Sequence, residues 1–209
     1  FAPDRIVLLP LYPQFSTTTT DSSVKAWRET AAKAKLSVPT QTVCCYPDEE
    51  GFISASIELL RQGLREAGNQ PSRVLFSAHG LPERVIKAGD PYQAQVERTA
   101  QAIVDRIGGL DWSVCYQSRV GPLKWIGPST DAEIVRAGTD KKAVVLYPLS
   151  FVSEHSETLV ELDMEYRHLA EKSAVPTYVR VPTVGTHPAF IAGLADRVRA
   201  VLADPQVAV

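Results

Sequence analysis

Residues 143–166 decide the fold, and their sequence is AVVLYPLSFVSEHSETLVELDMEY. The continuous apolar run Ala143–Tyr147 is typical of a buried strand, which Pro148 ends because proline has no amide hydrogen to donate. A helix is expected over Glu154–Lys172, with Ser153 as its N-cap and glutamates in its first turns, where the positive end of the helix dipole stabilises them. The stretch therefore predicts a buried strand followed directly by a long helix.

The expected helix carries two stripes. The apolar stripe, which predicts a face packed on a core, consists of Leu159, Leu162, Tyr166 and Leu169. The acidic stripe consists of Glu157, Glu161 and Glu165, each four residues apart. A solvated helix face is one interpretation of the acidic stripe. A functional site is the other, because no basic residue at helical spacing offsets the repulsion and because the stripe, with His155, begins just past the carboxyl end of a strand.

The composition excludes several classes of protein. A chain of 209 residues can form a sizeable core, and a net charge of -2 without a Lys/Arg-rich run argues against a nucleic-acid surface. No apolar run reaches the roughly 18 residues of a transmembrane segment, and no signal-peptide pattern is present. Cys44, Cys45 and Cys115 are too few for a disulfide framework or a four-cysteine iron–sulfur site. We therefore expect a reducing, cytoplasmic compartment.

Strand-like and helical patterns alternate along the chain. Strands are expected at Arg5–Leu9, Thr40–Cys45, Arg73–Phe76, Trp112–Tyr116, Ala143–Tyr147 and Thr177–Val181. Helices are expected at Ser22–Lys35, Phe52–Ala67, Pro91–Ile107, Asp131–Ala137, Glu154–Lys172 and Pro188–Leu202. Because such alternation requires crossover connections, it predicts an α/β fold of mostly parallel, Rossmann-like sheets flanked by helices.

The best candidate for a domain boundary is Gly68–Ser72. Phe1–Asp4 runs almost directly into an apolar strand without an initiating methionine, so we expect that the N-terminal portion of a longer protein is missing. On that interpretation Arg5–Ser72 is the end of one domain, and the chain from Arg73 onward is mostly a second.

A histidine stands at the end of the third expected strand. His79 is followed by Gly80, which permits a sharp turn or the close approach of a ligand. A lone histidine is often a structural group. At a strand end, however, a neutral imidazole can also accept a proton or bind a metal near pH 7.

Two other strand ends carry aromatic and polar candidates. Pro10–Ser16 is a proline-rich loop whose Tyr12 could form a pocket wall, and hydroxyl residues after it could cap the next helix. The loop after the fourth strand displays Trp125, which either covers a core edge or forms the wall of a pocket for a flat, apolar ligand. The polar groups available to such a ligand are Gln117, Ser118 and Arg119.

Several of these segments resemble the ferrochelatase family. They run through nearly the whole chain in the family's order and are Pro10–Ser16, Ser77–Pro82, Gly89–Tyr92, Tyr116–Gly121, Trp125–Pro128 and Phe151–Asp163. Several motifs in the right order are highly specific. Ferrochelatases are longer than this chain, which agrees with a missing N-terminal portion.

The resemblance implies insertion of Fe²⁺ into protoporphyrin IX with loss of two pyrrole protons, which forms protohaem in the last step of haem biosynthesis. Porphyrin and ferrous iron are then substrates, and no permanently bound cofactor is expected. Thr17 stands where some members have cysteine, so no [2Fe–2S] cluster is expected. Contact with a membrane surface and the oligomeric state are left open.

The resemblance also implies two Rossmann-like domains with a porphyrin cleft between them. Residues 1–72 would be the remainder of the first domain, residues 73–187 the second, and residues 188–209 a C-terminal helix that returns to the first. The family's active-site histidine corresponds to His79. Its acidic helix corresponds to Glu154, His155, Glu157, Glu161 and Glu165. The candidates for porphyrin contacts are Tyr12, Trp125, Gln117 and Ser118.

Two divisions of labour are open. In the one we favour, His79 takes a pyrrole proton and the glutamates lead metal in or protons out. In the other, His79 and Glu157 ligate the metal, with Glu161 and Glu165 as further ligand candidates. His155, the remaining catalytic candidate, would point away from Glu157 in an ideal helix, so a widened π-type turn is needed to bring them together.

Other functions are compatible with the same residues. A chelatase for another tetrapyrrole, such as coproporphyrin III or sirohydrochlorin, is the nearest alternative, and a non-catalytic porphyrin-binding module is another. A nucleotide-binding protein is disfavoured because no glycine-rich phosphate loop follows any strand.

Overall fold

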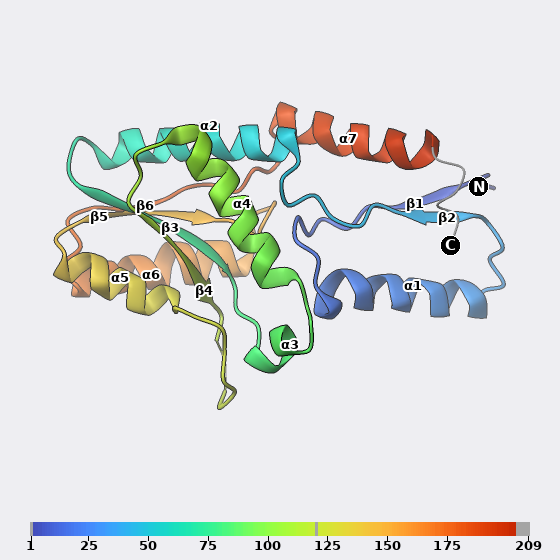
Figure 1. The fold of residues 1–209 in the computed structure, drawn as a ribbon, viewed down its shortest axis with the longest axis horizontal. Coiled ribbons are helices and arrows are strands. Elements are labelled where there is room, and N and C mark those ends of the chain that lie inside the picture. Colours follow the sequence, from blue (N-terminus) through green and yellow to red (C-terminus); the bar gives the residue numbers. More distant parts are fainter. Residues whose placement is uncertain (1, 120, 204–209) are drawn as a thin grey trace.

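The computed structural model describes residues 2–119 and 121–203 and arranges them around two parallel sheets (Figure 1). The smaller sheet pairs β1 (Ile6–Leu8) with β2 (Thr40–Thr42). The larger sheet has the strand order β4-β3-β5-β6. Its strands are β3 (Ser72–His79), β4 (Trp112–Gln117), β5 (Ala143–Pro148) and β6 (Tyr178–Arg180). The predicted α/β fold with parallel sheets is confirmed.

Helices connect the strands as the alternation predicts. They are α1 (Ser22–Lys33), α2 (Glu50–Ala67), α4 (Tyr92–Ile107), α5 (Thr130–Thr139), α6 (Tyr166–Lys172) and α7 (Pro188–Ala203). Two π-helical segments, η1 (Thr17–Asp21) and η2 (Glu157–Glu165), precede α1 and α6. The short α3 (Glu83–Lys87) was not predicted, because five residues are too few to show a helical period. None of the helices described here is long and apolar enough to cross a membrane.

The core lies on both faces of the larger sheet. Every residue of β5 is buried, as are the central residues of β3, which explains why these strands are continuous apolar runs. On one face α2 packs on β5 and β6 while α4 covers β4, and on the other face α5 packs on β3, β4 and β5 with α6 beside it. The sheet is therefore a middle layer between two layers of helices.

The helix α7 extends from the larger sheet to the smaller one. It packs against α2 and against both β1 and β2, and in Figure 1 it lies on the opposite side of the small sheet from α1. Two side chains of the small sheet reach its last turn, because Arg5 Nη1 donates to Leu202 O at 3.0 Å and Gln41 Nε2 donates to Val201 O at 3.0 Å. α7 thus connects the small sheet to α2, which packs on the larger sheet.

The predicted boundary at Gly68–Ser72 assigns α2 to the first domain. The structure packs α2 on the second sheet instead. A Cβ on Gly63 would lie 2.6 Å from Val181 Cγ2 and 3.2 Å from Val145 Cγ1, so the helix approaches β5 closely. The apolar face of α2 joins the same core as β5, which is the physical reason for its position. The division into two domains stays a prediction.

The strand order creates a switch point between β3 and β5. From β3 the chain moves to β4 on one side and then crosses to β5 and β6 on the other. Open α/β sheets bind ligands in the crevice outside the carboxyl ends of the strands at such a point. His79 is the last residue of β3, and the loop after β5 contains Phe151 and His155. The topology alone therefore places His79 and this loop at the edge where a ligand is expected.

Candidate active site

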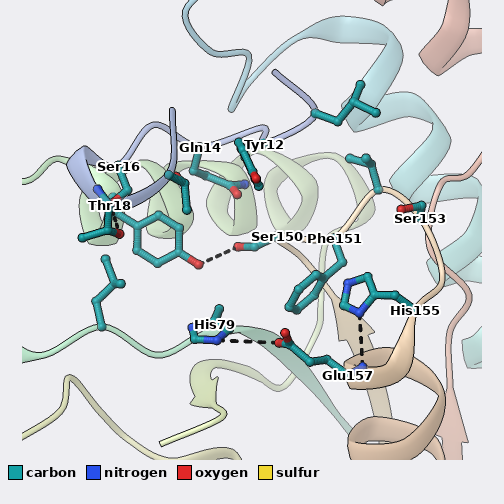
Figure 2. Close-up of a pocket in the computed structure, with 15 residues that line it drawn as sticks. Tyr12, Gln14, Ser16, Thr18, His79, Ser150, Phe151, Ser153, His155 and Glu157 are labelled. Atoms are coloured by element: carbon teal, nitrogen blue, oxygen red, sulfur yellow. Dashed lines mark hydrogen bonds and ion pairs between the residues drawn. The ribbon is translucent and has the colours of Figure 1, made fainter. Parts of the chain in front are cut away.

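A cavity of about 510 Å³ lies at this switch point. One wall is formed by the loop after β1 and by η1, and the opposite wall by the end of β3 and the loop after β5 (Figure 2). The lining residues are Leu11, Tyr12, Gln14, Ser16, Thr18, Thr19, His79, Leu81, Tyr92, Ser150, Phe151, Val152, Ser153, His155 and Glu157. This volume is within the range of pockets for small molecules and cofactors.

A backbone hydrogen bond selects one tautomer for the neutral form of His79. Its Nδ1 lies 2.8 Å from Gly80 O, and a carbonyl oxygen can only accept, so Nδ1 carries the hydrogen. The lone pair of the neutral ring is then on Nε2, which lies 3.7 Å from Glu157 Oε2. The His79 side chain is 41% exposed, so Nε2 is accessible from the pocket. The geometry provides a proton acceptor with a carboxylate beside it.

Gly80 allows the turn after His79 to lie close to β4. A Cβ on Gly80 would lie 2.9 Å from Gln117 O, to which Gly80 N–H also donates at 2.9 Å, and 3.4 Å from Trp125 Cε3. The close approach expected at this glycine is therefore to the backbone of the neighbouring strand.

Glu157 and Glu161 are joined by Ser118. The Ser118 hydroxyl lies 2.5 Å from Glu161 Oε2 and 3.3 Å from Glu157 Oε2, and Ser118 N–H donates to Glu161 Oε1 at 2.8 Å. Tyr166 also donates to Glu161 Oε1 at 3.1 Å. No Lys or Arg forms an ion pair with either glutamate among the residues described. Neutral donors therefore hold these carboxylates, and the chain of polar groups leads from the pocket to Glu161.

Ser118 has a left-handed backbone conformation, with φ of +57°. Residues other than glycine adopt this region at a cost of roughly 1–2 kcal/mol. The conformation turns both the amide and the hydroxyl of Ser118 toward Glu161. His79 pairs with Gln117, the last residue of β4. Ser118 is therefore the first residue after β4 and lies next to His79.

The acidic helix is π-helical, but the widened turns begin at Glu157 and His155 precedes them, so they do not lie between these two residues. η2 is π-helical over Glu157–Glu165, and Ser156 rather than Ser153 stands at its N-cap position. The predicted cap at Ser153 is wrong, because Thr158 Oγ1 instead accepts the His155 N–H at 2.9 Å and starts the helix later. Ser153 lines the cavity.

The wide turn also changes which side chains face the core. Leu159, expected in the core stripe, is 45% exposed. The buried residues of η2 and α6 are Thr158, Leu162, Tyr166 and Ala170. These residues lie at a constant step of four, whereas the prediction mixed three- and four-residue steps, and π turns contain more residues than α turns.

His155 has the opposite hydrogen-bonding pattern to His79. Glu157 N–H donates to His155 Nδ1 at 3.1 Å, so the neutral ring carries its hydrogen on Nε2. The ring packs edge-on against Phe151, with centroids 4.7 Å apart and planes at 68°. His155 therefore lines the pocket as a hydrogen-bond donor, whereas His79 lines it as an acceptor.

The facing wall is anchored by Asp90. Its carboxylate accepts Ser16 Oγ–H at 2.9 Å, Thr17 N–H at 2.7 Å and Thr17 Oγ1–H at 2.6 Å, and also Tyr92 N–H at 2.9 Å. Burial acts to raise the pKa of Asp90, but the hydrogen bonds from Thr17, Tyr92 and Ser16 outweigh it and lower the pKa. The ionised side chain thus ties the start of η1, and with it the Tyr12 loop, to the larger sheet.

Tyr92 lines the cavity beside this anchor. Its hydroxyl donates to Ser150 Oγ at 3.1 Å, which links α4 to the loop after β5. Burial raises the pKa of Tyr92 to about 12, so the phenol stays neutral and keeps its hydrogen. Tyr92 therefore acts as a fixed, uncharged part of the pocket surface.

The structure assembles some of the predicted site residues and separates others. Tyr12, His79, His155 and Glu157 line the cavity together. The other predicted residues lie outside its lining and are Gln117, Ser118, Trp125, Glu161 and Glu165. Arg119, weighed as a polar contact in the sequence, is likewise not among the lining residues.

Three residues predicted to contact the porphyrin lie outside the cavity lining and make contacts within the protein, so their role stays a prediction. Ser118 holds the two glutamates, while Gln117 is fully buried and accepts the Ser77 hydroxyl at 2.7 Å. The Trp125 ring packs against the turn at Gly80, and the Trp125 backbone pairs with Pro82 in an isolated bridge. Trp125 therefore supports the turn that follows His79. Each residue lies near the site, but its side-chain direction follows from strand pairing.

The four predicted metal-ligand candidates do not form one cluster in the structure, and their role stays a prediction. Within the described residues, no group of three or more His, Cys, Asp or Glu is arranged to hold a metal ion. Of His79, Glu157, Glu161 and Glu165, the first two form one pair, Glu161 is joined to Glu157 through Ser118, and Glu165 is exposed at the end of η2. The four residues therefore form a line that leads away from the cavity.

Sequence reasoning missed several lining residues. Gln14, Ser16, Thr18 and Thr19 belong to the loop and hydroxyl run after β1, and Phe151 begins the motif that contains His155. Both segments were recognised as strand ends. The side chains that face the cavity could not be chosen, because these loops have no periodicity from which a direction can be inferred.

Comparison with solved structures shows the class of fold. The structure of SirB from Bacillus subtilis with Fe³⁺ matches with a TM-score of 0.67 and 15% identity, and the match covers 99% of this chain and 76% of that one. A second SirB structure, described as a sirohydrochlorin chelatase in complex with cobalt, matches with a TM-score of 0.62 and 12% identity over 99% of this chain and 74% of that one. The chain therefore has a chelatase-like, Rossmann-type fold.

Comparison of sequences shows the family. The ferrochelatase family model matches residues 2–202, and the chain belongs to the ferrochelatase family. The Ferrochelatase of Caulobacter vibrioides is 59% identical over 201 residues, which cover 95% of this chain and 57% of the relative. The Ferrochelatase of Rickettsia typhi is 49% identical over 198 residues, with 94% and 56% covered. The chain thus spans little more than half the length of these relatives.

Proposed function

We propose that this protein is a metal-insertion enzyme that places Fe²⁺ into protoporphyrin IX and releases two pyrrole protons. Membership of the ferrochelatase family supports the proposal, as does a cavity of about 510 Å³ with a proton acceptor on one wall. Porphyrin and ferrous iron are the substrates in this proposal. We further propose a reducing, cytoplasmic setting and no iron–sulfur cluster, because Cys115 is buried in β4, away from Cys44 and Cys45, which follow β2.

The observation that carries the proposal is the tautomer of His79. With Nδ1–H donated to Gly80 O at 2.8 Å, the ring presents the Nε2 lone pair, and Glu157 Oε2 lies 3.7 Å from that nitrogen. A free-base porphyrin has to lose two N–H protons as the metal enters. His79 takes a pyrrole proton at Nε2, and the resulting imidazolium is stabilised by the carboxylate of Glu157.

Protons then leave along the carboxylates. Ser118 Oγ lies within 3.3 Å of Glu157 Oε2 and 2.5 Å of Glu161 Oε2, so its hydroxyl can receive a proton from one side and donate on the other. No Lys or Arg pairs with either glutamate among the described residues, so the route is free of fixed positive charge. Glu165 lies further along η2 and continues the route to solvent.

Ferrous iron accepts both imidazole and carboxylate ligands, so the His79–Glu157 pair is also the place where the ion meets the ring. Two protein ligands hold a metal less tightly than a complete site does, which suits an ion that has to be transferred. We assign proton acceptance to His79 for the same reason, because a tightly bound Fe²⁺ would have to be released to the porphyrin. Glu157 is the carboxylate contact for the metal.

We also propose the two-domain arrangement in which the porphyrin lies between the small-sheet wall and the large-sheet wall of this cavity. Residues of the loop after β1 face His79 across the cavity, which supports this placement (Figure 2). The C-terminal α7, which packs on α2 and is bonded by Arg5 and Gln41, links the small sheet to the helices of the larger one.

An anaerobic assay with Fe²⁺ and protoporphyrin IX tests the function directly, with coproporphyrin III as a second substrate. The full-length protein should form protohaem, and the His79→Ala variant should bind porphyrin without turning it over. A folded wild-type protein that binds porphyrin but never forms a metalloporphyrin would refute the proposed metal-insertion activity. Faster turnover of coproporphyrin would replace the proposed substrate and keep the reaction.

A further inference from the structure

Gln14 is a buried amide on the pocket wall that faces His79. Its side chain is among the cavity-lining residues although Gln14 is only 1% exposed. The Nε2 group donates to Thr99 Oγ1 of α4 at 3.1 Å. Figure 2 shows Gln14 beside Tyr12, across the cavity from His79 and Glu157.

Thr99 fixes the orientation of the Gln14 amide. The Thr99 hydroxyl donates its single hydrogen to a backbone carbonyl, with Pro47 O at 2.6 Å and Gln95 O at 2.9 Å as the acceptors in reach. It can therefore only accept from Gln14, which requires the NH₂ end of the amide at Thr99. A flipped amide would place two acceptors against each other.

The amide oxygen is consequently left without a partner. Gln14 Oε1 is buried and has no hydrogen-bond partner among the residues that the structure describes. A buried acceptor in this state is costly, and native structures usually satisfy such groups. Because the oxygen belongs to a residue of the cavity wall, a bound molecule with a hydrogen-bond donor would satisfy it.

We propose that Gln14 Oε1 accepts a hydrogen bond from a pyrrole N–H of the free-base porphyrin. This inference rests on the proposed function. With its carboxylates ionised, a free-base porphyrin has no N–H or O–H donor other than the two inner pyrrole groups. A pyrrole N–H that bonds to an acceptor above the ring is tilted out of the ring plane, and Gln14 and His79 lie on opposite walls. Gln14 is thus a substrate-contacting residue that orients the ring for proton loss.

The same contact distinguishes substrate from product. A metallated porphyrin has lost both inner hydrogens, so Gln14 Oε1 has no partner in the product complex. The free-base porphyrin should therefore bind more tightly than a metalloporphyrin of the same periphery, which favours product release.

The test compares the dissociation constants of protoporphyrin IX and its zinc complex, measured by porphyrin fluorescence with the full-length protein. Wild type should prefer the free base by about tenfold, in line with one satisfied buried hydrogen bond. Gln14→Met, which keeps the length of the side chain but removes the amide, should lose this preference by weakening free-base binding alone. Its effect on turnover should be in KM more than in kcat.

Gln95→Met is the matched control. Gln95 Oε1 accepts Phe15 N–H at 2.8 Å and so anchors the same loop, but Gln95 does not line the cavity. Its loss should weaken both porphyrins equally and leave the preference unchanged. Equal weakening of both porphyrins in Gln14→Met, or an unchanged preference, would overturn the inference.

The His79→Ala variant keeps the test decisive if Gln14→Met does not fold, because it removes the imidazole lone pair that could ligate zinc. Equal binding of the zinc complex and the free base in His79→Ala would overturn the role of Gln14. Absence of both porphyrin binding and iron insertion in folded wild type would instead refute the proposed function. Normal insertion with no discrimination at Gln14 would refute this inference alone.

Discussion

The amino end of the larger sheet and the glutamates beyond the ends of β3 and β4 hold their charged groups in opposite ways. At the amino end, the buried Arg73 contacts Asp111 at 3.1 Å and Asp140 at 2.9 Å, and Lys142 contacts Asp111 at 2.6 Å. Beyond the ends of β3 and β4, Glu157 and Glu161 bind a hydroxyl, an amide and a phenol, and His79 Nε2 lies 3.7 Å from Glu157 Oε2.

The difference separates structural charges from reactive ones. Opposite charges in direct contact hold each other in one protonation state, and removing one of them changes the free energy of unfolding. Carboxylates held by neutral donors can gain and lose a proton while the fold stays intact. The sheet therefore has locked ion pairs where β3, β4 and β5 begin and carboxylates held by neutral donors beyond the ends of β3 and β4, where α/β sheets bind ligands. At the end of β6 the neighbouring Glu154 is instead locked by Arg180 at 2.6 Å.

The largest expected effect is at the carboxyl end. His79→Ala should lower the rate of metal insertion by about 10²–10⁴-fold, the usual contribution of a positioned acid or base, while porphyrin affinity changes little. Turnover and fluorescence binding measured on the same sample separate the two effects. His168→Ala, at a histidine 65% exposed on α6, is the control and should keep full activity. Normal turnover in His79→Ala would contradict the assignment of reactive groups to the carboxyl end of the sheet.

The amino end should show a stability effect without a catalytic one. Arg73→Met removes a side chain that is 6% exposed from two aspartates that are 37% and 40% exposed. We expect a loss of about 1–3 kcal/mol in the free energy of unfolding, between the values for surface and buried pairs. Urea unfolding measures this loss, and activity per folded molecule should stay at the wild-type level. A variant that is stable but inactive would contradict this assignment.

Glu161→Gln sharpens the comparison within the acidic stripe. The change keeps the size of the side chain but removes a proton carrier next to Ser118. Insertion should slow by about tenfold, the lower part of the range for a proton-transfer group, with a change in unfolding free energy below about 1 kcal/mol. Glu165→Gln is the matched control in the same stripe and should change the rate by less. Equal rates for wild type and Glu161→Gln would make the stripe a solvated face.

The smallest effect expected is the acid sensitivity of the amino end. Burial acts to raise the pKa of Asp111, but its bonds to Arg73 and Lys142 outweigh it, and the pKa lies below its ordinary value of 3.8. A lowered pKa in the folded state stabilises the protein above the ordinary value, and this contribution disappears as the pH falls through the lowered pKa. The stability difference between wild type and Asp111→Asn should therefore shrink as the pH falls below about 4. A difference independent of pH would show that Asp111 acts through packing.

Local pattern was sufficient for the elements and for part of the site. The apolar run Ala143–Tyr147 predicted a buried strand because β5 is covered on both faces, and His79 was identified because a strand end is visible in sequence. A π-type turn was expected from helix geometry, and η2 is π-helical, although its widened turns begin at Glu157, after His155. These features depend on residues within a few positions of one another.

Side-chain direction was beyond reach of the sequence wherever it depended on a distant partner. Gln117 and Ser118 were expected to contact a ligand, but Gln117 meets Ser77 and Ser118 meets Glu161, each about forty residues away. Trp125 was expected on the pocket wall and packs behind Gly80. The pairing of His79 with Gln117 in the sheet positions Gln117 and Ser118, and the bridge between Pro82 and Trp125 positions Trp125.

The sequence by itself determined the α/β class, the order of the elements, and the presence of an imidazole and an acidic helix at neighbouring strand ends. These features follow from hydrophobic periodicity and from the residues that end strands, which are local properties of the sequence. Only the tertiary structure decided that Glu157 meets His79, that Ser118 joins the glutamates, and that Gln14 faces them with an unpaired oxygen. Those relations depend on strand register and on the packing of two sheets, which bring together residues that no local pattern connects.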